Sequence, residues 1–262
     1  MGSRIAMQAL ALLLACAAAA HAGVYIESVE KDTKSKKAGE THRFWAQGGN
    51  ARVEAGATTT LLKGDAMVVI DAKQKSYFVL DRAAMKRMAG QMNAMRDQMN
   101  SQLAGLPPEQ RAMVERMMGG GSMAGAAAPT IATVDTGRSE KVDGRTCRVW
   151  DVTMNAQVTQ QHCVVPFSGL PGKEDLRAIV ERMAALSEEL RKALPQMDAS
   201  MSDVAGGMNG YPVLTRYYER GKPSGRERRV SAWREESVAG DKFEVPAGYK
   251  QRDLAGEMRA AH

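Results

Sequence analysis

The sequence predicts an α+β fold in which a largely antiparallel β-sheet is interrupted by two helical segments. Short apolar stretches separated by turn residues follow one another from Gly23 to Asp81, with no helical pattern between them. Two later stretches, residues 82–118 and 173–194, instead repeat apolar residues every three or four positions. Neither helical segment can bury its apolar side alone. Each must therefore lie against the sheet, against the other helix or against a ligand.

Residues 1–22 have the features of a cleavable signal peptide. Arg4 supplies a positive charge, the run Ile5–Ala20 is almost wholly apolar, and small residues end at Ala22. We expect cleavage before Gly23 and a periplasmic protein without a transmembrane segment. Lipidation at Cys16 is an alternative, although Leu14 fits a lipoprotein signal poorly and the first strand begins close behind the cysteine.

Export narrows the possible partners. Losing Arg4 lowers the formal charge from +6 to +5, and a weakly basic exported protein has little access to nucleic acid. Anionic lipid or another protein is the favoured partner. The remaining chain, 23–262, is long enough for one substantial domain, here with an insertion at about 82–118.

The first part of that domain reads as an antiparallel meander. Gly48-Gly49-Asn50, Gly64-Asp65 and Asp71–Gln74 occupy the places where turns are needed. The six predicted strands are Val24–Val29, Thr41–Ala46, Ala51–Glu54, Thr58–Lys63, Met67–Ile70 and Tyr77–Leu80.

The insertion carries a stripe of methionines. The first helix presents apolar residues at helical spacing, ends at Leu106-Pro107, and precedes a second predicted helix, Glu109–Met118, and a flexible Gly/Ala linker, 119–129. Three interpretations remain open: core packing, an adaptable surface for acyl chains or a lipoprotein partner, and copper(I) binding by thioethers. Histidines do not alternate with the methionines, which weakens the copper interpretation. The stripe comprises Met85, Met88, Met92, Met95, Met99, Leu103 and Leu106.

Strands resume after the linker at Thr130–Asp135 and Glu140–Val142, and a hairpin of Thr146–Thr153 and Gln157–Val165 turns about Asn155. Cys147 and Cys163 are equally distant from Asn155, so we expect them to face each other and form a disulfide. The chain continues with the helix Lys173–Leu194, two strands and a closing segment; the last three ranges are Val213–Arg220, Glu227–Glu236 and Phe243–Lys250.

Motifs for catalysis do not occur. The sequence has no His-Glu-x-x-His, no Gly-x-Ser-x-Gly and no paired carboxylates at a spacing that suggests acid and base roles, so we expect a protein that is not an enzyme and uses no cofactor. The Gly119-x-Gly121 stretch follows a predicted helix rather than a strand and reads as linker. Five arginines could form a solvated or lipid-binding basic patch: Arg216, Arg220, Arg226, Arg228 and Arg229.

Several stretches together resemble a bacterial envelope family, the domain of unknown function 4412. The first half of the resemblance lies in Gly23–Ile26, Asn50–Glu54 and Val68–Tyr77, and the second half in Val142–Cys147 and Phe243–Tyr249. This family is similar in pattern to the periplasmic lipoprotein carrier LolA and its relatives. The resemblance implies an unclosed, strongly curved antiparallel sheet whose concave face is covered by amphipathic helices, with acyl chains held between them.

From the residues and the resemblance together, we expect a non-enzymatic periplasmic protein that binds a lipid or a lipoprotein acyl chain between sheet and helices. The alternatives are a helix-displaying module that binds an envelope protein and, less favoured, a copper(I)-binding protein. The residues expected to line the ligand site are Met88, Met92, Met95, Met99, Ile179, Met183 and Leu186.

Overall fold

The computed structural model describes residues 22–35, 39–107, 109–110, 130–193 and 207–253. The predicted signal peptide through residue 21, Cys16 within it, most of the predicted helix Glu109–Met118 and the whole linker 119–129 lie outside these ranges. Expectations about those segments therefore stay predictions.

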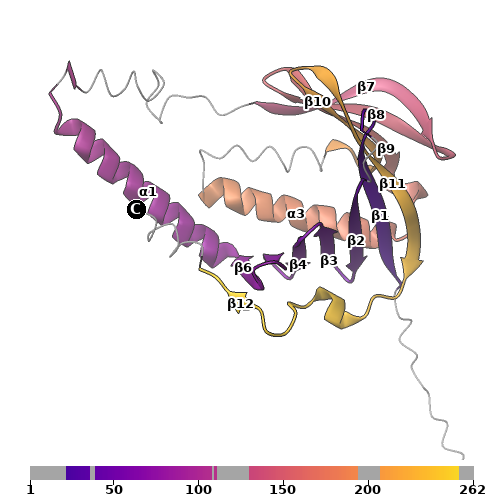
Figure 1. Cartoon of the computed structure of the whole chain (residues 1–262), viewed down its shortest axis with the longest axis horizontal. Helices are drawn as coiled ribbons and strands as arrows, with labels where there is room; N and C mark the ends of the chain where they lie inside the picture. The colour runs from indigo at the N-terminus through magenta and orange to yellow at the C-terminus, as the bar shows by residue number, and fades with distance from the viewer. Residues whose placement is uncertain (1–21, 36–38, 108, 111–129, 194–206, 254–262) are drawn as a thin grey trace, which may run out of the picture.

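The described residues form one 12-stranded sheet that does not close on itself (Figure 1). Every neighbouring pair of strands is antiparallel except β12 and β6. In spatial order the strands are β12 (Lys250–Gln251), β6 (Ser76–Leu80), β5 (Ala66–Asp71), β4 (Thr58–Lys63), β3 (Asn50–Ala55), β2 (Glu40–Gln47), β1 (Gly23–Asp32), β11 (Lys222–Glu236), β10 (Gly210–Glu219), β9 (Gln157–Pro166), β8 (Arg145–Met154) and β7 (Ile131–Val142).

The predicted mostly antiparallel, open sheet is confirmed, but one predicted break is wrong. The two strands expected at Thr130–Asp135 and Glu140–Val142 are a single strand, β7. Its pairing with β8 shifts between Asp135 and Ser139, where Gly137 takes a positive φ of 70°. The turn-like residues therefore form a β-bulge inside a continuous strand.

Two helices interrupt the sheet. Helix α1 (Arg82–Ala104) begins at Asp81, whose side chain accepts a hydrogen bond from the Ala84 N–H, and it stops shortly before Pro107. Helix α3 (Lys173–Ala193) follows a 3₁₀ turn, η1 (Phe167–Gly169), and lies inside the curve of the sheet (Figure 1).

The main core lies between α3 and the sheet. Leu176 and Ile179 of α3 are buried in one cluster with Val24, Ala46 and Leu62 of the facing strands. A second, smaller cluster lies on the opposite face of the sheet, where the turn η2 (Gly240–Phe243) covers it. It comprises Tyr25, Trp45, Val238 and Phe243.

Helix α1 does not cover the concave face of the sheet, although the family resemblance implied that both helices would. Its contacts in the described structure are with α3 and with the strand β6, and the helix runs on beyond the sheet (Figure 1). The reason is the place where the helix begins. Because α1 leaves the sheet directly from β6, near one edge, only its first turns have strands beside them.

Candidate functional site

The concave face of strands β2 to β6 carries two parallel rows of side chains. The first row, Ala46, Ala51 and Leu62, is buried in the core that contains α3. Because side chains two positions apart point to the same face, a second row lies beside it on these strands. We call this second row the open row; by strand register it consists of Phe44, Val53, Thr60, Val69 and Phe78.

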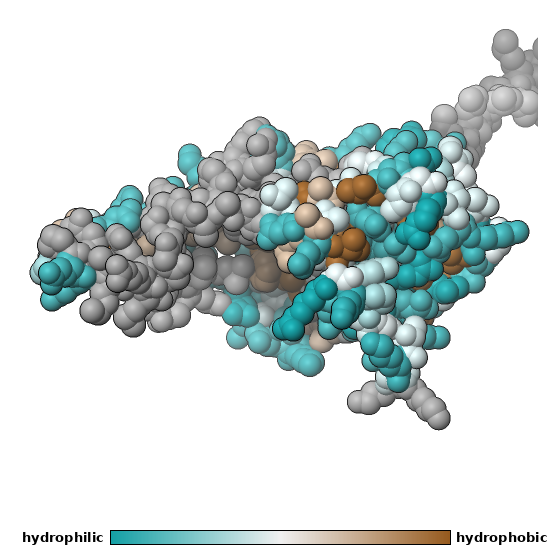
Figure 2. Space-filling model, turned by 90° about the horizontal axis from the view of Figure 1, so that it is seen from above, coloured by the Kyte–Doolittle hydropathy of each residue, from teal (hydrophilic) through white to brown (hydrophobic). Residues whose placement is uncertain are grey.

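The open row is only half-buried. Val53, the second residue of the row, is 37% exposed, and the other four side chains are intermediate between buried and exposed. The single helix α3 covers the first row and buries it, whereas the neighbouring open row keeps access to solvent. From above, the molecule is mostly hydrophilic, with hydrophobic residues gathered near the middle of that face (Figure 2).

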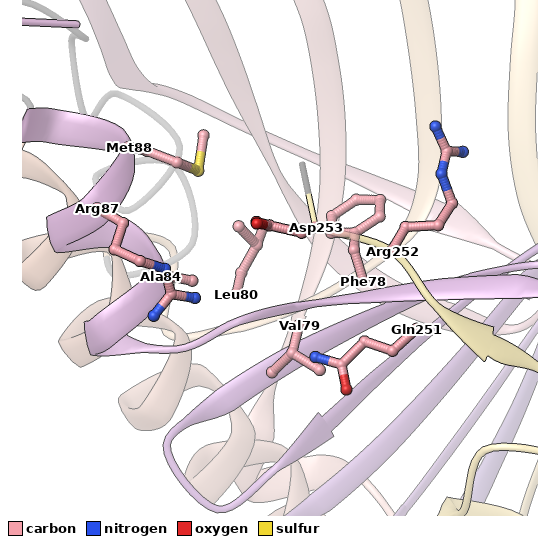
Figure 3. A pocket seen from close by; sticks show the side chains of 9 residues that line it. All are labelled: Phe78, Val79, Leu80, Ala84, Arg87, Met88, Gln251, Arg252 and Asp253. Atoms are coloured by element: carbon pink, nitrogen blue, oxygen red, sulfur yellow. The ribbon is translucent and has the colours of Figure 1, made fainter. Parts of the chain in front are cut away.

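An opening lies at one end of the open row. It has a volume of about 310 Å³ and is bounded by β6, the first turns of α1 and the chain after β12. Phe78 and Leu80 contribute from β6, and Met88 reaches toward them from α1 (Figure 3). Arg87 and Arg252 are cationic groups among its walls.

Aromatic side chains lie at the other end of the open row. Phe44 lies 6.4 Å from Tyr211 between ring centroids, and Tyr211 meets Trp233 edge-on at 4.9 Å. The Trp233 indole N–H donates to the Pro171 carbonyl, just before α3. Burial raises the pKa of Tyr211, so its phenol stays neutral.

Helix α3 is held to the tips of the meander by polar contacts. Asp175 accepts a hydrogen bond from the Gly48 N–H at 2.8 Å, and Arg182 donates to the Gly49 carbonyl at 2.8 Å. Both glycines have positive φ, as the tight turn between β2 and β3 requires. A Cβ atom on Gly49 would lie 2.9 Å from the Arg182 guanidinium carbon, so the end of that flexible side chain would have to shift.

The space between α1, α3 and the β4–β5 turn is small. Its volume is about 120 Å³, and Leu62, Met85 and Leu186 provide its apolar walls. Charged residues surround it, including Arg82 and Glu189, which form an ion pair at 3.1 Å. This space is therefore smaller than the opening beside β6.

The predicted ligand-lining residues divide into three groups. Ile179 is buried in the main core, and Met183 and Leu186 pack against that core. Met88 borders the opening. Met92 and Met95 are 41% and 52% exposed, and Met99 is half-buried; α1 carries these three residues beyond the sheet.

Sequence reasoning missed the open row. A signal for it was present, because apolar residues also stand two positions from Ala46 and Ala51, at Phe44 and Val53. What the sequence did not contain is the position of α3, which decides which row of that face remains exposed.

The predicted disulfide between Cys147 and Cys163 is present, with a Cα–Cα distance of 5.2 Å. Its cysteines are not directly opposed, however, because the register places Val149 opposite Cys163. A two-residue turn at Asn155 and Ala156, both with positive φ, and a register shift near Thr153 displace the strands. The bridge therefore joins diagonal neighbours on one face.

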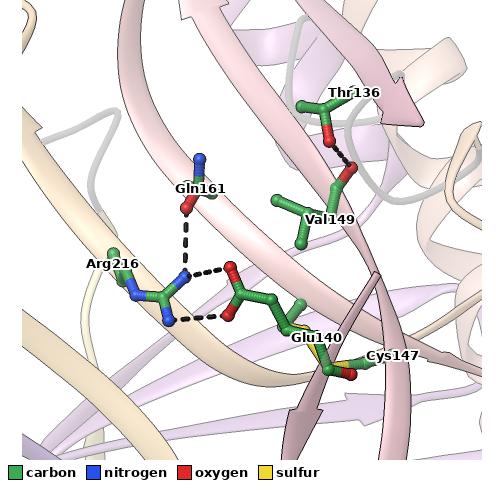
Figure 4. The surroundings of a disulfide bond; sticks show 7 residues. Thr136, Glu140, Cys147, Val149, Gln161 and Arg216 are labelled. Carbon is green, nitrogen blue, oxygen red and sulfur yellow. Dashed lines mark hydrogen bonds and ion pairs between the residues drawn. A yellow bond between two sulfur atoms is a disulfide. The ribbon is translucent and has the colours of Figure 1, made fainter. Parts of the chain in front are cut away.

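A polar network crosses the strands beside the disulfide (Figure 4). Arg216 donates two hydrogen bonds to Glu140, at 3.1 and 2.7 Å, and a third to the Gln161 side-chain oxygen at 3.0 Å. The bidentate Arg216 contact lowers the pKa of Glu140. Gln161 in turn donates to Asp151, so the network connects β7 through β10.

Three of the five arginines in the expected basic patch have acidic partners: Arg216 with Glu140, Arg226 with Glu30, and Arg229 with Asp143. This pairing reduces the charge that the patch could offer to a lipid surface.

The described ranges contain neither a membrane-spanning helix nor a metal-ligand cluster. None of the helices there combines the length and hydropathy of a membrane-spanning segment. In that part of the chain, no three His, Cys, Asp or Glu side chains come together as metal ligands.

No protein-family model matches this chain, and no curated protein matches it. Similar solved structures include an uncharacterized conserved protein from Thermus thermophilus, with 6% identity and a TM-score of 0.44 over 88% of this chain and 90% of that one. MucB matches with 12% identity and a TM-score of 0.31 over 88% of this chain. The MucA/MucB complex of Pseudomonas aeruginosa matches with 13% identity and a TM-score of 0.30 over 87% of this chain. This chain spans 59% of the MucB chain and 57% of the matched chain in the complex.

Proposed function

We propose that this chain is an exported, non-enzymatic protein that binds the acyl chain of a lipid or lipoprotein along the open row. One observation carries the proposal: a continuous, half-exposed row of mostly apolar side chains crosses five strands beside α3. An extended apolar chain lying in this row would cover those side chains and contact the flank of α3.

The dimensions of the row suit such a ligand. Neighbouring strands lie about 4.8 Å apart, so the four steps from Phe44 to Phe78 span roughly 19 Å. This span is comparable with the length of a long acyl chain. Each methylene that leaves water would contribute about 0.8 kcal/mol.

Met88 at the opening adds an adaptable side chain where the ligand would leave the row. In this arrangement the end of the ligand that carries its polar group would lie near α1, where the opening also has polar walls.

The compartment is part of the proposal. The amino-terminal residues have signal-peptide character, and the disulfide suits an oxidising environment. Export would place the open row in the compartment where lipoprotein acyl groups have to cross water.

Fluorescence titration with pyrene-labelled palmitate tests this proposal. We expect saturable binding that unlabelled palmitate displaces. Val53→Asp should reduce the affinity at least tenfold, because it places a charge within the apolar row. Val134→Asp is the matched control, since Val134 is a similarly exposed strand valine, 48% exposed, outside this row. Equal affinities for the two variants would contradict the site.

A second measurement addresses the natural ligand. Protein purified gently from its own envelope should release lipid on organic extraction, in an amount that approaches one acyl ligand per chain for the wild type. The Val53→Asp variant should release markedly less. A wild-type protein without extractable lipid would count against the proposed function.

One observation favours a second candidate, a module that binds an envelope protein through α1. Met92 and Met95 are exposed on the part of α1 that extends beyond the sheet, and flexible methionines suit an adaptable protein contact. Replacing both with glutamate should then abolish capture of that protein while leaving palmitate binding intact. Loss of palmitate binding alone would instead place the ligand on α1.

A further inference from the structure

The two edges of the sheet differ in their protection. At one edge β12 pairs with β6, and the Lys250 and Arg252 N–H groups donate to the Lys75 and Tyr77 carbonyls. At the other edge β7 is outermost, and no described strand pairs with its outer side. An unpaired edge presents a row of backbone donors and acceptors to another strand.

The hydrogen bonds of β7 identify which of its backbone groups face outward. The Thr130 carbonyl accepts from the Asn155 N–H at the end of β8, and the Ala132 carbonyl accepts from the Thr153 hydroxyl of β8. Backbone groups of an antiparallel strand alternate in direction. The N–H and C=O groups of Ile131, Thr133 and Asp135 therefore point away from β8.

Only one half of this edge, which we call the guarded half, has features that oppose pairing with another strand. The second half of β7 contains the bulge at residues 136–138 and the charged residues Arg138 and Lys141, features that discourage strand pairing. Residues 131–134 are Ile-Ala-Thr-Val, with no charge, bulge or proline. Val134 in this stretch is 48% exposed, and Met154, opposite Ile131 on β8, is 43% exposed.

We propose that this unguarded half of β7 is a dimerisation edge, where a second copy of this chain adds its own β7 in antiparallel pairing. The outward backbone groups are self-complementary about Thr133. With Thr133 opposite the same residue of the second copy, the outward groups of Ile131 meet those of Asp135 on both sides of the axis. This twofold arrangement satisfies the same groups in both copies and extends the sheet.

The side chains agree with this register. Ala132 falls opposite Val134 of the second copy, so the exposed valine gains an apolar neighbour across the new strand pair. The register also makes the contact short, because the bulge that follows Asp135 prevents pairing from continuing along β7. Because the twofold contact uses the same edge of both copies, it closes on itself, and we expect a dimer rather than an open-ended assembly.

Sedimentation equilibrium over a range of concentrations tests the dimer. The wild type should show a concentration-dependent dimer, and Thr133→Pro should weaken it at least tenfold, because proline removes an outward N–H without touching the β7–β8 hydrogen bonds. Thr133→Val is the matched control and should remain dimeric. A wild type that stays monomeric at every concentration would overturn the proposal, as would a Thr133→Pro variant that dimerises equally well.

Cross-linking tests the register independently of the association constant. Residues opposed in a hydrogen-bonded pair have Cα atoms about 5.5 Å apart, within disulfide range. Thr133→Cys should therefore give a covalent dimer on mild oxidation, whereas Lys141→Cys, on the guarded half of the strand, should not. Equal cross-linking of both variants would contradict the proposed axis. Palmitate binding by Thr133→Pro should be unchanged, so failure of the dimer and failure of the lipid site can be told apart.

Discussion

The two halves of the sheet are stabilised in different ways. In β7 to β10, the Cys147–Cys163 disulfide joins the neighbouring strands β8 and β9, and the Arg216–Glu140 ion pair reaches from β10 to β7. In β1 to β6, the concave face depends on α3, which buries one row of side chains and leaves the open row half-exposed. Both halves contribute to the core under α3. We call β7 to β10, which these cross-strand links join, the frame half, and the open row of the proposed site lies on the other half.

Apolar residues occupy both rows of the concave face of β2 to β6, so the sequence pattern alone does not separate buried core from accessible surface. What separates them is the element that lies above the strands. Where α3 or η2 covers a row, the row is core; where no described element covers it, the row remains accessible. Four changes test this difference, and their expected effects decrease from the first to the last.

Truncating Leu176, a buried residue of α3, should have the largest effect on stability. Leu176 is 2% exposed in the main core, so Leu176→Ala should lower the free energy of unfolding by about 2 to 5 kcal/mol in a urea titration. Met95→Ala on α1 should lower it by less than about 0.5 kcal/mol, because that side chain is 52% exposed. Equal losses would show that α1 and α3 support the meander to the same degree.

Removing the disulfide should lower the stability of the frame half, β7 to β10. The bridge closes a loop with a sequence separation of 16 residues, which corresponds to roughly 3 kcal/mol of stability in the chain-entropy model. A double Cys147→Ala, Cys163→Ala variant should show this loss by urea denaturation. Adding reductant should lower the wild type toward the variant and leave the variant unchanged. A wild type that is insensitive to full reduction would contradict this prediction.

Acidification should also destabilise the frame half, through His162. Burial lowers the pKa of His162 from 6.5 to about 4, with a smaller contribution from Arg228, while its Nδ1 lies 2.9 Å from the Thr215 hydroxyl. Between these two pKa values the unfolded chain binds a proton that the folded chain does not. Stability should therefore fall as the pH decreases from about 6.5 to 4, by up to about 3 kcal/mol from this residue.

His162→Gln isolates that contribution, because glutamine retains a polar side chain but does not titrate. Carboxylates with lowered pKa values, such as Glu140, lose their stabilising effect at lower pH in both proteins. The difference between wild type and variant therefore reports on His162. Parallel stability curves across this pH window would refute its role.

The smallest effect on stability should come from the open row. Val53→Thr replaces one half-exposed methyl group by a hydroxyl, so the free energy of unfolding should change by less than about 0.5 kcal/mol. The affinity for pyrene-labelled palmitate should nevertheless fall by roughly fourfold, the equivalent of one buried methylene. A large loss of stability with unchanged affinity would make the row part of the core instead of a ligand site.

The sequence by itself determined most of the local structure. Short apolar stretches separated by turn residues predicted the meander from β1 to β6, and apolar residues at helical spacing predicted α1 and α3. The pairing of Cys147 with Cys163 also followed from their places in one hairpin. These features depend on neighbours that are close along the chain, which is the range over which patterning and turn chemistry act.

Only the tertiary structure decided which apolar surfaces are covered. Met92 and Ile179 both belong to apolar stripes with helical spacing, yet Ile179 is buried and Met92 is exposed, because α3 lies inside the curve of the sheet whereas α1 leaves it near an edge. The open row beside Ala46 and the unpaired side of β7 arise in the same way. Each depends on what lies next to it in space, which neither hydrophobic periodicity nor turn residues encode.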